Sequence, residues 1–123
     1  MIKEYAIVFV GGGVGSVLRY SISLALQKFQ ILLHGFPLHT FAVNVLGSFV
    51  IGLLMGYLYK NPTHWLFLLF VVGVCGGFTT FSTFALESVN LLKTQHFATM
   101  IVYMLSSLAL CVSAVFAAMR IVG

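Results

Sequence analysis

Residues 73 to 84 read GVCGGFTTFSTF, in the middle of an otherwise apolar run. Two adjacent glycines, four hydroxyl side chains and three phenylalanines within this stretch do not favour a regular membrane helix. An unpaired backbone group in lipid costs several kcal/mol, so a broken helix persists only where protein buries it or where it lines a watery path. Broken helices at membrane depth also direct backbone carbonyls toward ions. The stretch therefore predicts an ion site near the middle of a membrane span.

The composition indicates an integral membrane protein. Hydrophobic residues make up 61% of the 123 residues and charged residues only 7%, and the mean hydropathy is +1.12. A soluble domain usually carries about 25% charged residues. We therefore expect a single all-α membrane domain over residues 1–123, and the scattered basic residues favour loop flanks over nucleic-acid binding.

Four apolar runs are each long enough to cross a bilayer as a helix, which takes about 20 residues. The polar segments between these runs are too short to hold a soluble domain, and the second contains an Asn-Pro turn signal. The predicted spans are Tyr5–Leu26, Phe36–Tyr59, Trp65–Leu92 and Phe97–Val122.

The distribution of basic residues gives almost no orientation signal. Four spans place Lys3, Lys60 and Arg120 on one side of the membrane. The other side has Lys28 and Lys93, with Arg19 inside the first span leaning toward it. Because the Lys and Arg bias normally sets orientation, we predict that the chain inserts both ways and forms an antiparallel homodimer. The alternative is that a bias of one residue suffices, and a C-terminal tag found on one side only would favour it.

Glycine spacing predicts close helix packing. Gly11 with Gly15, and Gly52 with Gly56, are small-xxx-small pairs that allow helix backbones to approach each other. The glycine-rich segment 11–16 lacks the lysine of a phosphate-binding loop and lies inside a span, so packing is the better interpretation.

Polar groups at membrane depth are functional candidates by default. Arg19 is either a fixed charge that attracts anions or an anchor bound to carbonyls. Asn44 is either a packing hydrogen-bonder between helices or an anion ligand. Glu87 and the hydroxyls from Thr79 to Thr83 complete the set.

Aromatic and hydroxyl side chains share helix faces near the predicted break. Phe81 and Phe84 are three residues apart, so they lie on one face of a helix. Phenylalanine in a membrane span usually serves in packing, but the positive edges of these two rings could instead contact a small anion. Tyr103, Ser107 and Cys111 form a stripe along the fourth span. The two cysteines are expected to be free thiols, and the four histidines, in or beside loops without metal-ligand spacing, to be solvated.

Three segments together resemble the Fluc family of fluoride channels, also called CrcB. They are GGGVGSVLRY at 11–20, TFAVNVLGS at 40–48 and GVCGGFTTFSTF at 73–84, and the resemblance extends over the whole chain. It implies a multi-pass protein of the inner cell membrane that forms a dual-topology antiparallel homodimer with two fluoride pathways. It also implies a central structural sodium ion held by the backbone carbonyls of Gly76 and Thr79.

The resemblance also assigns side chains to the fluoride pathways. The pore residues implied are Asn44, Phe81, Phe84, Ser82, Thr83, Tyr103 and Ser107. Polar positions toward a pathway end are Arg19, Thr40 and Glu87. Cys111 departs from the hydroxyl expected on the pore face of span four.

The function expected is passive export of fluoride, with no chemistry performed. One alternative is a small dual-topology multidrug or cation exporter, which needs a membrane-embedded carboxylate; Glu87 is the only candidate. A second alternative is an assembly subunit without transport of its own. An enzyme is disfavoured, because the sequence shows no nucleophile–base pair and no metal-ligand set.

Overall fold

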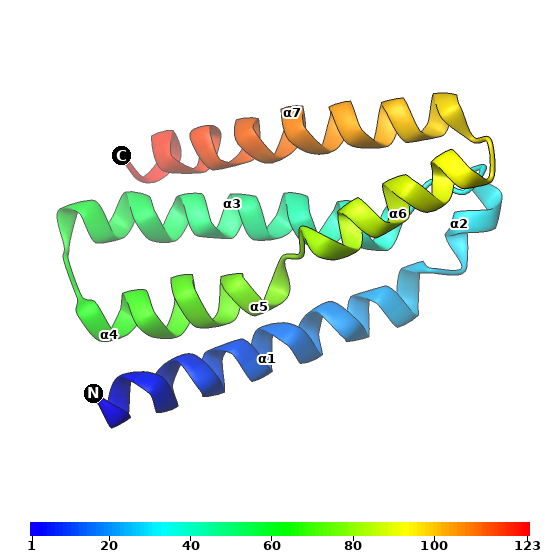
Figure 1. Cartoon of the computed structure of the whole chain (residues 1–123). Coiled ribbons are helices and arrows are strands. Elements are labelled where there is room, and N and C mark those ends of the chain that lie inside the picture. Colours follow the sequence, from blue (N-terminus) through cyan, green and yellow to red (C-terminus); the bar gives the residue numbers. More distant parts are fainter.

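The computed structural model describes all residues from 1 to 123 and is entirely helical. Its helices run nearly side by side, and the third span is assembled from several pieces (Figure 1). The elements in chain order are α1 (Ile2–Leu26), α2 (Phe29–Leu32), α3 (Leu38–Lys60), α4 (His64–Leu66), the π-helix η1 (Phe67–Cys75), α5 (Gly76–Phe78), α6 (Ser82–Lys93) and α7 (Phe97–Val122).

Four helical segments are long and apolar enough to cross a membrane: Ile2–Leu26, Leu38–Lys60, His64–Lys93 and Phe97–Val122. The protein is thus a multi-pass membrane protein, as its composition predicts, and each predicted span is found within three residues of its ends. The two termini and the turn between α3 and α4 lie at the same end of the bundle, as four consecutive crossings require (Figure 1). The short α2 was not predicted.

The glycine pairs are packing sites, as predicted. Gly11 and Gly15 are buried in α1, where a Cβ atom would meet the backbone oxygens of Leu69 and Val74 respectively. Gly52 packs in the same way against α7, where its Cβ would lie 2.6 Å from Val115 O. The helices pair as α1 with η1 and α3 with α7. The helices are thus held by close backbone contact, because burying apolar side chains away from lipid contributes little free energy in a bilayer.

The third span breaks after α5, as its sequence predicts. Thr79 is extended (φ −87°, ψ 159°), and the helix resumes only at Ser82. The wide turns of η1 precede the break; π-helical turns are rare and are frequently found at functional sites. The chain therefore changes direction between α5 and α6 (Figure 1).

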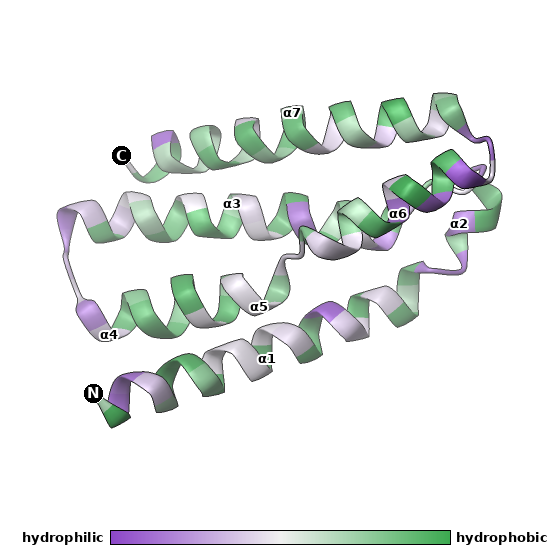
Figure 2. Ribbon diagram, viewed as in Figure 1, coloured by the Kyte–Doolittle hydropathy of each residue, from purple (hydrophilic) through white to green (hydrophobic).

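The surface of the single chain is strongly apolar. Large hydrophobic side chains are exposed along every long helix. The most hydrophilic residues gather at the turns, with isolated patches within the helices (Figure 2). Lipid and partner protein are the surroundings that such a surface fits.

Candidate functional site

Asn44 joins α3 to the broken third span. Its Nδ2 donates to Thr80 O at 3.0 Å, and its Oδ1 accepts from Thr80 N–H at 2.8 Å. The side-chain amide therefore pairs with both backbone groups of one residue in the break. This two-point contact supports the packing interpretation of Asn44, although the side chain also borders the cavity described below.

The diverted hydrogen bonds leave two backbone carbonyls without their usual helical donors. In a continuous helix Thr80 N–H would donate to Gly76 O, and Thr83 N–H would donate to Thr79 O. Instead, Thr80 N–H donates to Asn44, and Thr83 N–H donates to the Thr80 hydroxyl at 3.3 Å. Oxygen ligands of this kind suit a hard cation.

Arg19 reaches the same region from α1. Its Nε donates to Gly77 O at 3.1 Å, across 58 residues of sequence. This contact supports the anchor interpretation of Arg19. The guanidinium holds one carbonyl of the break and leaves those of Gly76 and Thr79 free.

A cavity of about 290 Å³ lies beside the break, between α3, α6 and α7. One hydroxyl in its wall, Ser107 Oγ, is buried and has no hydrogen-bond partner. A buried polar atom left unpaired costs about 1–3 kcal/mol and calls for an explanation. The lining residues are Asn44, Gly47, Ser48, Ile51, Cys75, Thr79, Thr80, Phe81, Phe84, Ser107, Leu108 and Cys111.

The two phenylalanines stand next to each other at this cavity but differ in burial. Their ring centroids are 5.6 Å apart, with the planes tilted by 39°. Phe84 is 7% exposed and packs against the Tyr103 ring at 5.1 Å. Phe81 is 75% exposed in the single chain. Phe81 therefore places a large, uncovered apolar ring at the rim of the cavity.

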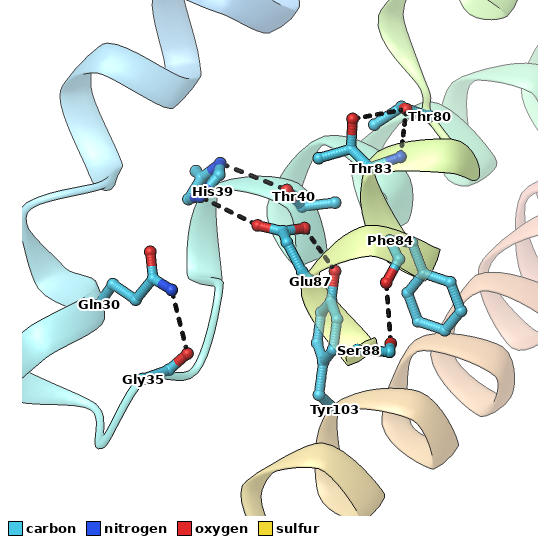
Figure 3. A network of polar contacts seen from close by, with 10 residues as sticks. All are labelled: Gln30, Gly35, His39, Thr40, Thr80, Thr83, Phe84, Glu87, Ser88 and Tyr103. Carbon is cyan, nitrogen blue, oxygen red and sulfur yellow. Dashed lines mark hydrogen bonds and ion pairs between the residues drawn. The ribbon is translucent and has the colours of Figure 1, made fainter. Parts of the chain in front are cut away.

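A hydrogen-bonded network surrounds Glu87 on the α6 face (Figure 3). Tyr103 OH donates to Glu87 Oε1 at 3.1 Å. His39 Nε2 lies 3.2 Å from Glu87 Oε2, and His39 Nδ1 lies 3.3 Å from Thr40 Oγ1. A second cavity of about 160 Å³ adjoins Glu87 at the end of the bundle. Glu87 and Tyr103 therefore stand between that end and the cavity at the break.

The solvated-loop expectation was wrong for His39. His39 lies in the first turn of α3, and its side chain is 15% exposed because it packs against Glu87. The histidine stands five residues before Asn44 in the chain, but its pairing with α6 arises only from the tertiary fold. An acidic partner 48 residues away gives no local sequence signal.

The other residues predicted for the fluoride pathway lie partly at the cavity and partly outside it. Ser82 is exposed at the start of α6 and does not line the cavity. Thr83 Oγ1 accepts a hydrogen bond from the Thr80 hydroxyl at 3.1 Å, and the same hydroxyl accepts from Thr83 N–H in the first turn of α6. Thr40 is buried beside His39. Cys111 lines the cavity together with Ser107, which places the α7 stripe on this face.

Comparison with known proteins gives one consistent family. The family model described as "CrcB-like protein, Camphor Resistance (CrcB)" matches residues 6–119. A protein of Elusimicrobium minutum named fluoride-specific ion channel FluC is 47% identical over 116 residues, covering 94% of this chain and 90% of the relative. Proteins with the same name from Azobacteroides pseudotrichonymphae (43% identity; 85% and 84% covered) and Bacteroides fragilis (42%; 94% and 92%) are also similar. These relatives are named as channels, not as enzymes.

Proposed function

We propose that this chain, which belongs to the CrcB family, is a fluoride-selective channel that lets fluoride leave the cell passively. The observation that carries the proposal is the cavity at the helix break. It combines the unpaired Ser107 hydroxyl with Asn44 and the phenylalanine pair. The relatives named fluoride-specific ion channels support the choice of ion.

The chemistry of this cavity suits a small, strongly hydrated anion. The Ser107 hydroxyl and the second amide hydrogen of Asn44 offer neutral donors that replace water. The edges of Phe81 and Phe84 add positive potential without a full charge. Since conduction requires binding that is weak enough to release the ion, neutral donors serve this function better than a lysine or arginine.

The contacts of Glu87 argue against the alternative function of a multidrug or cation exporter. Its two oxygens contact Tyr103 and His39 in the resting fold. A carboxylate that exchanges protons for cations must be open to its substrate. The tethered position of Glu87 instead suits a group that shapes the entrance of an anion pathway.

The antiparallel homodimer belongs to the same proposal. An antiparallel pair has a twofold axis in the membrane plane, so that each residue of the break faces its copy. The 75% exposure of Phe81 and the open side of the cavity support burial of this face by a second copy. Two such cavities then give two pathways per dimer.

A sodium ion on the twofold axis fits the free carbonyls. Gly76 and Thr79 of each copy offer four oxygens, and both residues lie at the accessible surface of the single chain. The carbonyls of Gly76 and Thr79 would hold the ion, which would supply a positive charge that offsets their dipoles. Asn44 and Arg19 hold the neighbouring backbone, so the oxygens are positioned in advance.

Sodium removal is expected to stop fluoride efflux. We expect dimers purified and reconstituted with N-methylglucamine in place of sodium to lose at least about 90% of their flux, because unpaired carbonyls would face each other at the interface. Fluoride-electrode recordings from liposomes would measure this loss. Restored flux on adding sodium, but not potassium at equal ionic strength, is the matched control; full flux without sodium would contradict the proposed ion.

Phe81→Ile tests the pathway itself. The substitution keeps apolar volume but removes the ring edge, so we expect fluoride efflux to fall about tenfold, the equivalent of about 1.4 kcal/mol. Wild-type liposomes should release fluoride and retain chloride. Phe9→Ile is the control, since Phe9 is 82% exposed on α1, away from the cavity. Wild-type liposomes that release no fluoride would refute the proposed function.

A further inference from the structure

Glu87 raises an electrostatic problem for an anion pathway. Its side chain is 12% exposed and lies between the cavity at the break and the end of the bundle. An ionised carboxylate there repels fluoride as it enters. A pathway that contains this residue therefore needs a nearby positive charge that offsets the carboxylate.

We propose that His39 is this counter-charge, and that its protonation increases fluoride entry as the pH falls. This inference rests on the proposed fluoride function. The imidazole Nε2 lies 3.2 Å from Glu87 Oε2, and the histidine side chain is 15% exposed. With neutral His39 the pair carries one negative charge, and with protonated His39 it carries none. Histidine is the side chain whose charge ordinarily changes between pH 5 and 8.

The second nitrogen of His39 couples the same proton to a hydroxyl. His39 Nδ1 lies 3.3 Å from Thr40 Oγ1. When Nε2–H points at Glu87 and the ring is neutral, Nδ1 accepts the Thr40 hydroxyl hydrogen. A protonated ring donates from Nδ1 instead, so Thr40 becomes the acceptor and its hydrogen turns toward the Glu87 carboxylate beside it. Protonation thus removes a net negative charge and moves the Thr40 donor onto the carboxylate.

The other titratable groups around Glu87 do not provide this charge. Tyr103 of α7 donates to Oε1 as a neutral phenol. His96, in the turn before α7, lines the end cavity with Glu87, but its Nδ1 pairs with the Thr94 hydroxyl at 2.8 Å. Lys28 and Lys93 are exposed at the same end of the bundle, where salt screens them. Of the titratable groups, only His39 contacts the carboxylate from α3; its neighbour there, Thr40, is a neutral hydroxyl.

The experiment is fluoride efflux from liposomes held at the same pH inside and outside, between pH 5.5 and 8. Efflux from protein-free liposomes is subtracted, because hydrogen fluoride crosses lipid without help. We expect wild-type efflux to rise about tenfold from pH 8 to pH 5.5, a size typical of local electrostatic effects on ion entry. His39→Gln should keep the pH 8 rate and lose the rise.

Two further variants complete the test. His64→Gln removes the matched histidine–glutamate pair with Glu4, 3.5 Å apart and largely exposed, so it should keep the wild-type profile. Glu87→Gln removes the repelling carboxylate, so its efflux at pH 8 should rise toward the wild-type rate at pH 5.5, which also tests the proposal if His39→Gln does not fold. A wild-type profile that is flat, a rise that survives in His39→Gln, or a Glu87→Gln rate at pH 8 no higher than that of the wild type would overturn the role of His39 while leaving the channel intact. Wild-type protein that passes no fluoride at any pH would overturn both proposals.

Discussion

Asn44→Asp is expected to reduce fluoride efflux about a thousandfold. The wild-type amide both donates to and accepts from Thr80. A carboxylate can only accept, so Thr80 O loses its partner, at a cost of about 1–3 kcal/mol. The larger effect is charge: two unit charges 4 Å apart at an effective dielectric constant of 20 repel by about 4 kcal/mol, which corresponds to about three orders of magnitude in rate. Fluoride-electrode recordings of efflux from liposomes would show this loss.

The control for Asn44→Asp is Asn61→Asp. Asn61 also donates from its side-chain amide to a backbone carbonyl, that of Tyr57 at 3.3 Å, but it is exposed in the turn after α3. The same chemical change there should leave efflux unchanged. Size-exclusion profiles should show both variants as dimers. Efflux by Asn44→Asp within about threefold of the wild type would remove Asn44 from the pathway.

The fold was readable from the sequence because a bilayer imposes strong constraints on composition. Long apolar runs fix the spans, and the glycines and hydroxyls of residues 73–84 fix the place of the break. The π-helix η1 was not predictable, because its residues Phe67–Cys75 include no local marker that separates a π-helix from an α-helix. In the fold, η1 packs against α1, a contact that no residue pattern within 67–75 specifies.

The cavity contains some of the predicted pore residues, among them Asn44 and Ser107, but not Ser82, and its hydrogen bonding could not be predicted. Asn44 was identified from its depth in a span, whereas its two-point contact with Thr80 depends on how α3 meets the break. For Arg19, the sequence could not decide between attraction of anions and anchoring, and the bond to Gly77 O favours anchoring. His39 was wrongly predicted to be solvated because it lies near the end of a span, and the sequence does not show that Glu87 of α6 packs against it.

Gly15→Ala is expected to destabilise the protein by about 1–3 kcal/mol, the usual cost of adding a methylene to a tightly packed site. A Cβ at Gly15 would clash with Val74 O and lie 2.8 Å from Phe78 N. Both contacts are backbone atoms of the third span, so no flexible side chain can move aside. The added methyl group must therefore push α1 away from η1 and α5, and with it the Arg19 contact to Gly77 O.

Gly13→Ala separates this packing effect from helix propensity. Gly13 lies in the same helix, and no atom of another helix lies within 4 Å of its Cβ position, so alanine there should be neutral or stabilising by up to about 1 kcal/mol. Unfolding by sodium dodecyl sulfate in mixed micelles, followed by circular dichroism, would give both free energies. Since Gly15 does not line the cavity, a loss of efflux in Gly15→Ala should track the loss of folded protein. Equal stabilities for the two variants would mean that α1 does not hold the broken helix by close backbone contact.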